Sequence, residues 1–450
     1  MTARFRTLAD LSRALRARQV TATDVTQRCL DRIAERNPSL NAFIAVYAES
    51  ALAAAHATDG EIATGRYRGP LHGVPISLKD LIDVRGMPTT AASRVRDGHV
   101  AAADAVVTAR LREAGAIIVG KTNLHEFAFG TTNEDSAFGP VRHPLDPERS
   151  PGGSSGGSAA SVLDDMAYAS IGTDTGGSIR IPAAACGLVG LKPGLGEIPT
   201  GGVVPLSATM DHLGPLCRSV EDAGLLYAVL RGTVDPEPWT ARDVRGLRLG
   251  VPRPYFFDQL DTEVADRFDD ACQRLSRAGV LLEDVAIAHA QDIGPVYLHL
   301  VLPEAAAYHA ETLEHRAGDY TPNVRIRLEM GRYVLAEDYL RARLGREVLT
   351  GEVDSAVDGR DGLLLPTLAV PAIQLGAATV RVGASDEPVR NITLRLTQLF
   401  NITGHPALTL PCGLTGTGLP VGAQLVGARG RTLDLLRVAA AVEPSVSLPS

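Results

Sequence analysis

The stretch "GTDTGGSIRIP", Gly172–Pro182, decides how the rest of the chain is interpreted. It follows the apolar run "AYASI" and places Ser178 directly behind Gly176 and Gly177. Because glycine has no side chain, two in succession let the main chain turn tightly and aim successive N–H groups at one point beside the serine hydroxyl. Such a turn can stabilise an oxyanion, which favours acyl-transfer chemistry at Ser178.

A second glycine-rich run, "SPGGSSGGS", covers Ser150–Ser158. A Gly/Ser run on its own is typical of a flexible linker. This one is followed by "AASVLDDMAYASI", a short helical pattern and then a buried strand pattern, which favours a turn at the start of a helix. Exposed N–H groups at a helix start bind anions, either a phosphate or the oxyanion of an acyl-transfer intermediate. The chain has no P-loop lysine motif for a nucleotide phosphate.

A serine nucleophile needs a neighbouring base to accept its proton. The histidines lie in no motif with chemistry of its own, and we interpret His72 and His405, each before a predicted strand, as structural loop residues. Lys79 ends the apolar run in "GVPISLKD", where desolvation would lower its pKa from roughly 10.4. The residues alone leave Lys79 open as a catalytic base or as a solvated strand end.

Composition narrows the class of protein and of partner. Of 450 residues, 45% are apolar and 21% are charged, which is typical of a folded globular protein. The formal net charge of −8 and the lack of a polybasic run argue against nucleic acid or anionic membranes as partners and favour a small molecule. Five widely spaced cysteines without a CxxC pair indicate reduced core thiols and no metal site. No apolar run has the length of a signal or membrane segment, so we expect a cytoplasmic protein.

Short apolar runs alternate with helical patterns along most of the chain. This alternation predicts the α/β class, with a large mixed, mostly parallel central sheet covered by helices on both faces. Near the N-terminus, Leu8, Leu11 and Leu15 recur at helical spacing behind a threonine that can cap the helix. The strand-like runs are "GVPISL", "AIIVG", "AYASIGT", "GLVGLKP", "LRLGVP", "GLLLPTLAV", "ALTLPCG" and "AQLVG".

Five segments together resemble the amidase signature family: "GVPISLKD", "GKTNLHEFAFG", "SPGGSSGGSAASV", "IGTDTGGSIRIPAAACGLVGLKP" and "MDHLGPLCRSVEDA". They occur in the family's order and at about its separations, and the similarity extends from "TLADLSRAL" to "GLPVGAQLVG". The resemblance implies a hydrolase of carboxylic amide C–N bonds that forms a serine acyl-enzyme with a Ser-Ser-Lys triad and needs no cofactor. Related anilides, carbamates or esters remain open as substrates.

Carried over by position, the resemblance implies Ser178 as nucleophile, Ser154 as bridging serine after a cis peptide bond, and Lys79 as base. The backbone N–H groups of Thr175, Gly176 and Gly177 would form the oxyanion hole. The sequence departs from the family pattern at Asp164 and Asp165, which we expect on the solvent side of a helix. It departs again after "GLKP", where "GLGEIPTGGVVP" replaces an aromatic and a basic residue, so the substrate is not implied.

We expect residues 1–450 to form a single amidase domain. Its parts would be N-terminal helices at about 1–65, a signature core at about 66–220, and a C-terminal half at about 240–450 that completes the sheet. A composition shift at 232–246 marks a candidate linker. The sequence leaves a homodimer open.

Three alternative functions fit parts of the sequence. The chain could be the amidase subunit of a tRNA-dependent amidotransferase, although "QLFNITGHPALTLPCGLTGTGLPVGAQLVG" resembles stand-alone amidases more closely. The segment "GGSSG" matches the nucleophile elbow of α/β-hydrolases, with Ser154 as nucleophile and His405 as base. A non-catalytic phosphate-binding module would use the glycine turns alone, but it lacks a P-loop lysine and a Rossmann fingerprint.

Overall fold

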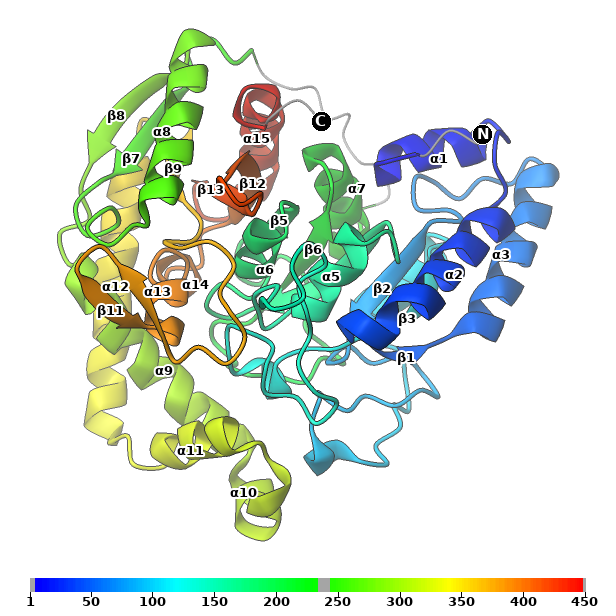
Figure 1. Ribbon diagram of the computed structural model, residues 1–450, viewed down its shortest axis with the longest axis horizontal. Coiled ribbons are helices and arrows are strands. Elements are labelled where there is room, and N and C mark those ends of the chain that lie inside the picture. Colours follow the sequence, from blue (N-terminus) through cyan, green and yellow to red (C-terminus); the bar gives the residue numbers. More distant parts are fainter. Residues whose placement is uncertain (1–4, 234–242, 448–450) are drawn as a thin grey trace.

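The computed structural model describes residues 5–233 and 243–447 (Figure 1). Its strands are β1 Phe43–Val46, β2 Pro75–Lys79, β3 Ile117–Thr122, β4 Ala169–Asp174, β5 Val189–Lys192, β6 His212–Cys217, β7 Arg248–Pro252, β8 Leu281–Val285, β9 Gly362–Pro366, β10 Thr379–Val382, β11 Ser385–Pro388, β12 Ala407–Leu414 and β13 Pro420–Val426. Its α-helices are α1 Leu8–Arg16, α2 Ala22–Leu40, α3 Ala48–Ala63, α4 Val106–Glu113, α5 Gly156–Leu163, α6 Arg180–Ala185, α7 Val220–Arg231, α8 Thr262–Arg277, α9 Ile293–Tyr308, α10 Ala310–Arg316, α11 Pro322–Gly331, α12 Ala336–Val357, α13 Val389–Leu394, α14 Leu399–Ile402 and α15 Thr432–Val446.

One 11-stranded sheet runs through the molecule in the order β1-β3-β2-β4-β6-β5-β12-β13-β9-β7-β8. Strand β2 pairs in parallel with β3 and β4, and β7 pairs in parallel with β8 and β9. The other six neighbouring pairs are antiparallel. The predicted α/β class with a mixed sheet is therefore confirmed, but the prediction of a mostly parallel sheet is wrong.

Two of the antiparallel pairs, β5–β6 and β12–β13, join consecutive strands. No α-helix lies between β5 and β6, and β12 is joined to β13 by only residues 415–419. Parallel neighbours require a long crossover, usually a helix, whereas short connections let consecutive strands pair antiparallel. Each apolar run quoted above corresponds to a strand, but such a run does not specify the direction of that strand.

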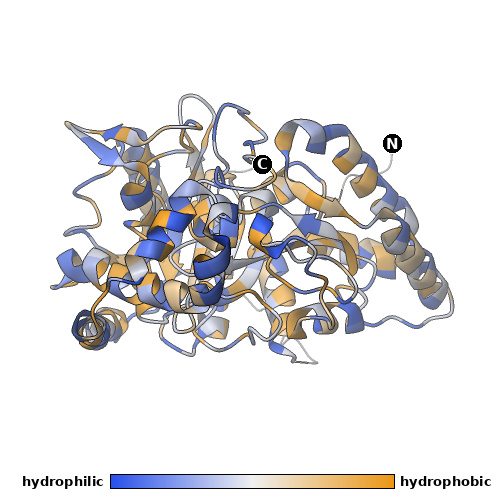
Figure 2. Cartoon of the chain, turned by 90° about the horizontal axis from the view of Figure 1, so that it is seen from below, coloured by the Kyte–Doolittle hydropathy of each residue, from blue (hydrophilic) through white to orange (hydrophobic). Residues whose placement is uncertain are grey.

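Helices cover both faces of the sheet. Every residue of β2, β4, β6 and β9 is buried, which requires a layer on each side. Helix α5 packs on β2 and β4, and α15 packs on β12 and β13. Figure 1 shows the N-terminal helices in blue at one end of the molecule and β7, β8 and α8 at the other. In Figure 2 the outer helices alternate hydrophilic and hydrophobic residues, as amphipathic surface helices do.

The N-terminal helices begin at capping threonines, as the sequence predicted. The Thr7 hydroxyl accepts a hydrogen bond from the Asp10 N–H at the start of α1, and Thr21 caps α2 through the Asp24 N–H.

No helix in residues 5–233 and 243–447 combines the length and the hydropathy that a membrane span requires. The candidate linker at 232–246 lies mostly outside the described residues, because 234–242 are not among them. All five cysteines are buried and free.

The expected solvent position of Asp164 is wrong. Asp164 follows α5 and is buried, and its carboxylate pairs with Arg32 at 3.0 Å and with Arg36 at 3.1 Å. Both arginines lie on α2, so this aspartate joins α2 to the end of α5. The neighbouring Asp165 is partly exposed and pairs with Arg218 at 2.7 Å.

The topology brings the sequence motifs to one edge of the sheet. Strands β2 and β4 are parallel neighbours, so their carboxyl ends, Lys79 and Asp174, lie on the same side. The turn at residues 175–178 continues from β4, and α5 begins at Gly156, within the glycine-rich run Ser150–Ser158. Ligands commonly bind outside the carboxyl ends of parallel strands, which makes this edge the candidate site.

Candidate active site

Lys79 is fully buried at the end of β2. Its Nζ donates hydrogen bonds to Oγ of Ser154 at 2.8 Å and to Oγ1 of Thr173 at 2.7 Å. Within the described residues, no carboxylate forms an ion pair with it. Burial lowers the pKa of Lys79 to about 7, although the negative charges of Asp174 and Asp211 oppose that shift. A lysine with this pKa is partly neutral near pH 7, and its neutral form can accept a proton.

Ser154 lies between Lys79 and the glycine turn. The peptide bond between Gly153 and Ser154 is cis, as the resemblance implied. The Ser154 carbonyl accepts a hydrogen bond from the His125 N–H at 3.1 Å, and the Ser155 N–H donates to the Ser178 carbonyl at 3.3 Å. The second of these bonds joins the two glycine-rich runs, whereas the first joins Ser154 to His125. Among the described atoms, no hydrogen bond links the hydroxyl groups of Ser154 and Ser178.

The turn at residues 175–178 has little room for side chains. Gly177 has a φ of +143°, and a Cβ atom there would lie 2.3 Å from Oγ1 of Thr397. A Cβ atom on Gly176 would lie 2.4 Å from the Tyr297 hydroxyl oxygen. The Thr397 hydroxyl donates to the Gly176 carbonyl at 2.6 Å and fixes the peptide orientation. In the described ranges, none of the four N–H groups of residues 175–178 donates to a protein acceptor, so they are available to an oxyanion.

A buried ion pair joins Asp174, which precedes the turn, to Arg180, which follows it. Arg180 and Asp174 are fully buried, and their Nη2 and Oδ1 atoms lie 3.0 Å apart. Oδ2 of Asp174 accepts the Ile179 N–H at 3.1 Å, and Oδ1 accepts the Asn401 amide at 2.8 Å. Burial alone would raise the pKa of the Asp174 carboxyl, but the Arg180 guanidinium holds it well below its usual range. Arg180 also donates to Gln424 at 2.6 Å, which ties the turn to β13.

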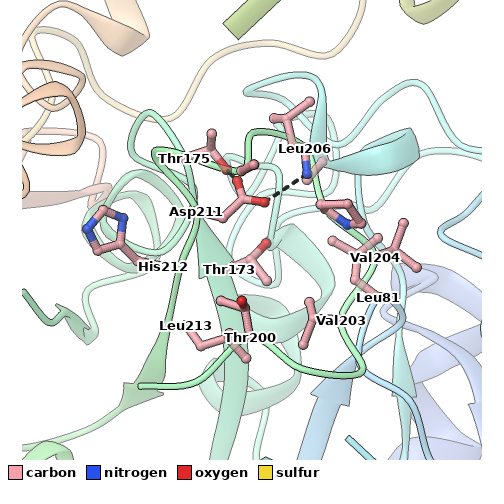
Figure 3. A pocket seen from close by; sticks show the side chains of 13 residues that line it. Leu81, Thr173, Thr175, Thr200, Val203, Val204, Leu206, Asp211, His212 and Leu213 are labelled. Carbon is pink, nitrogen blue, oxygen red and sulfur yellow. Dashed lines mark hydrogen bonds between the residues drawn. The ribbon is translucent and has the colours of Figure 1, made fainter. Parts of the chain in front are cut away.

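A cavity of about 300 Å³ lies beside Thr173 and Thr175 (Figure 3). Its walls are mainly apolar, and Asp211 is the acidic residue among them. Oδ1 of Asp211 accepts the Thr175 hydroxyl at 2.6 Å, and Oδ2 accepts the Leu206 N–H at 2.8 Å. Burial raises the pKa of Asp211 to about 6. Ser178 does not line this cavity, so we do not assign the cavity as the site of the reacting carbonyl.

The sequence matches a known protein family over most of its length. The sequence model of the Amidase family matches residues 24–436. The chain belongs to the amidase signature family. An amidase from Pseudomonas putida is 41% identical to it over 98% of this chain and 96% of the relative. As a member of this family, the chain is a hydrolase of carbon–nitrogen bonds.

Solved structures support the same family. A crystal structure described as an amidase superposes on this amidase with a TM-score of 0.93, with 37% sequence identity over 98% of this chain and 100% of the other. A glutamyl-tRNA(Gln) amidotransferase subunit from Thermotoga maritima gives a TM-score of 0.77, with 32% identity over 94% of this chain and 91% of the other. The predicted fold is therefore that of the amidase signature family.

The structure of this amidase brings the predicted residues together. Lys79 and Ser154 are hydrogen-bonded, and Ser178 lies at the end of the turn that contains Thr175, Gly176 and Gly177. The histidines His72 and His405 have hydrogen bonds elsewhere, His72 with the Arg68 N–H and His405 with Thr403 and Asp354. Ser154 contacts a lysine instead of a histidine and the chain is an amidase, so the α/β-hydrolase interpretation is wrong.

Sequence reasoning missed three residues that shape the site. Thr173 accepts a hydrogen bond from Lys79, and Asp211 accepts one from Thr175. The Tyr297 hydroxyl lies against Gly176. Thr173 stands in the quoted stretch "GTDTGGSIRIP", within β4 and two residues before Thr175. Asp211 stands in the quoted motif "MDHLGPLC", but Tyr297 lies on a long apolar helix with no motif around it.

Proposed function

We propose that this amidase hydrolyses small-molecule carboxylic amides through an ester on Ser178. Ser154 is the bridging serine and Lys79 is the general base. The observation that carries the proposal is the 2.8 Å hydrogen bond between Lys79 and Ser154 in a buried setting that lowers the pKa of Lys79 to about 7. A neutral lysine joined to a serine is a base with a ready path for the proton.

The proposed reaction begins when Oγ of Ser178 attacks the amide carbonyl carbon. Ser154 takes the proton from Ser178 and passes its own proton to neutral Lys79. The negative charge on the carbonyl oxygen is stabilised by the N–H groups of Thr175, Gly176 and Gly177. For this relay the Ser154 and Ser178 hydroxyl groups must come within hydrogen-bond distance as substrate binds.

The relay then runs in reverse. Lys79 returns its proton through Ser154 to the amide nitrogen, the C–N bond breaks, and ammonia or an amine leaves. Water attacks the ester carbonyl with Lys79 and Ser154 again accepting the proton, and the carboxylic acid and free Ser178 are released.

A second candidate is the amidase component of a tRNA-dependent amidotransferase. It is supported by the match to the Thermotoga maritima protein, but that superposition has the lower TM-score, 0.77 against 0.93 for the amidase. We therefore favour a stand-alone amidase. Glutamine hydrolysis that requires added partner subunits would reverse this choice.

An uncharged fluorophosphonate, which phosphonylates active serines with loss of fluoride, tests the proposal. Peptide mass spectrometry should find the label on Ser178, and Ser178→Ala should lose both labelling and hydrolysis of amide, anilide, carbamate and ester chromogens. Ser161→Ala is the matched control, because this buried serine of α5 bonds to Ser77 at 3.0 Å and has no role in the proposed relay. A label on Ser154 in place of Ser178 would overturn the assignment of the nucleophile.

A further inference from the structure

We propose that Glu304 positions the oxyanion turn, residues 175–178, through the loop at residues 205–211. Glu304 lies on α9, and in the described part of the chain it has no hydrogen bond to the turn or to Lys79. It therefore acts on the reaction only through other residues. This inference rests on the proposed function, in which N–H groups of the turn stabilise the oxyanion.

The carboxylate of Glu304 accepts four hydrogen bonds. Three come from the 205–211 loop: from the Ser207 hydroxyl, from the Thr209 N–H at 3.2 Å and from the Thr209 hydroxyl at 2.7 Å. The fourth comes from the Tyr339 hydroxyl of α12 at 3.1 Å. Among the described residues, no lysine or arginine forms an ion pair with Glu304. A carboxylate offers about four acceptor positions, so this one serves mainly to bind the loop.

Ser207 connects Glu304 to Asp211. Ser207 is fully buried, and its N–H donates to Oδ1 of Asp211 at 3.1 Å. Its carbonyl accepts the Asp211 N–H, also at 3.1 Å. The hydroxyl that Glu304 binds thus belongs to a residue whose main-chain N–H and C=O groups both bind Asp211. A shift of Ser207 would move the Asp211 carboxylate with it.

Asp211 connects the loop to the oxyanion turn, and Figure 3 shows its carboxylate between Thr175 and Leu206. Oδ1 of Asp211 accepts the Thr175 hydroxyl at 2.6 Å, and Oδ2 accepts the Leu206 N–H at 2.8 Å. Thr175 is the first residue of the turn, and its N–H is one of the proposed oxyanion donors. Because such donors act only when they are aimed at the developing charge, a small displacement of Thr175 should slow the reaction.

Helix α9 contacts the turn at a second point. Tyr297 and Glu304 are about two helical turns apart, so they lie on the same face of α9. A Cβ atom on Gly176 would lie 2.4 Å from the Tyr297 hydroxyl oxygen, which places this end of the face directly against the turn. The same face of α9 therefore supports Gly176 by packing and Thr175 through Glu304 and the loop.

Steady-state kinetics of Glu304→Gln tests the positioning role. The glutamine keeps the length of the side chain but replaces one acceptor oxygen with an NH2 group, which cannot accept hydrogen bonds from the loop. We expect kcat for a chromogenic amide to fall by about 10- to 100-fold. KM should change by less than about twofold, because the oxyanion forms only after the substrate has bound.

Tyr339→Phe is the matched control variant. It removes the fourth hydrogen bond from the same carboxylate but leaves the three loop contacts in place, so kcat should change by less than about twofold. If Glu304→Gln fails to fold, Ser207→Ala deletes one hydroxyl group from the loop side of the same contact and should give the same selective loss of kcat. Equal losses in the Glu304 or Ser207 variant and in Tyr339→Phe would contradict action through the loop.

A double-mutant cycle with Asp211→Ala separates positioning from a general loss of stability. Asp211→Ala removes the acceptor of the Thr175 hydroxyl, so the path from Glu304 to the turn is already broken. Adding Glu304→Gln to this variant should lower kcat by less than about twofold further, measured for each variant at a pH on its plateau. Losses that multiply in the double variant, or a Glu304→Gln variant with the kcat of the wild type, would overturn the inference.

A labelling assay keeps this inference distinct from the proposed function. The phosphonyl oxygen of the uncharged fluorophosphonate gains negative charge as a serine attacks, so the rate of labelling also depends on the turn. A wild type that is not labelled at Ser178 contradicts the proposed function and this inference with it. Labelling of Ser178 at equal rates in the wild type and in Glu304→Gln contradicts the positioning role alone. Slower labelling in Glu304→Gln, with an unchanged rate in Tyr339→Phe, supports it.

Discussion

Nζ of Lys79 and Oγ of Ser154 lie 2.8 Å apart, and neither side chain is exposed to solvent. The proposed base is thus joined to the bridging serine before any substrate binds. Thr173 takes a second hydrogen bond from the same nitrogen and restricts where the lysine can point. Only the contact between Ser154 and Ser178 remains to be formed, which divides the relay into a preformed half and a half completed with substrate.

Residues that work as one relay should lose most of their effect with the first deletion. We expect Ser178→Ala to lower kcat by about 10⁴- to 10⁶-fold, and Lys79→Met with Ser178→Ala to be only slightly worse. Steady-state kinetics on a chromogenic amide measures these two variants and Lys79→Met alone. Fully multiplicative losses would show that Lys79 and Ser178 act in separate steps.

The turn should not tolerate a methyl group at Gly177. In Gly177→Ala the new Cβ would lie 2.3 Å from Oγ1 of Thr397 at a φ of +143°, so the peptide must move. Moving the N–H groups away from the oxyanion should lower kcat by about 10²- to 10³-fold with a small change in KM. The control is Gly196→Ala, where φ is +78° but no atom lies within 4 Å. Equal losses in both variants would mean that backbone strain alone explains the effect.

Most of the central strands could be predicted from local patterns in the sequence. The apolar runs predicted the central strands because each is short, buried and bounded by glycine or proline. Strand β6 was missed, since Gly214 and Pro215 interrupt the apolar pattern of "HLGPLC". The pairing of Leu191 in β5 with Leu408 in β12 joins residues more than two hundred positions apart, and no local pattern encodes such a contact.

The residues of the candidate site also fall into two groups, those that lie in a sequence motif and those that do not. Ser178, Ser154 and Lys79 could be identified because each lies in a motif whose glycines or apolar neighbours restrict the backbone. Tyr297 and Leu394 lie in no motif, and they meet the turn only through the packing of α9 and α13. The prediction of a single domain over 1–450 stays a prediction.

The pH dependence of activity should follow Lys79. Because Lys79 has a pKa of about 7 and must be neutral to accept a proton, kcat/KM should rise with pH through that region and then level off. The negative charge of Asp211 raises the pKa of Lys79, so Asp211→Asn should move the rise toward acid. The asparagine keeps an oxygen for the Thr175 hydroxyl, whereas Asp211→Ala removes it and should also lower the plateau. An unshifted profile in Asp211→Asn would show that another group controls the rise.

The stability of the fold should also depend on pH through the ionisation of Lys79. The folded pKa of Lys79 is about 7 and the unfolded value is roughly 10.4, so between these values the unfolded chain binds more protons. Burial of Lys79 therefore destabilises the fold increasingly as pH falls from about 10.4 to about 7, and the penalty is constant below that. Lys79→Met removes this penalty and keeps an apolar stem of similar length, so the variant should be inactive yet no less stable than the parent near pH 7.

Denaturant unfolding at several pH values measures this difference, and Lys121→Met provides the contrast. Lys121 is also fully buried in the sheet, but its Nζ lies 2.7 Å from the buried Asp80 carboxylate. Removing it leaves that carboxylate unpaired, which should cost about 3–5 kcal/mol. The advantage of Lys79→Met over the parent should shrink as pH rises toward about 10.4. If Lys79→Met instead loses as much stability as Lys121→Met near pH 7, Lys79 is a charged structural residue and its assignment as the base must be dropped.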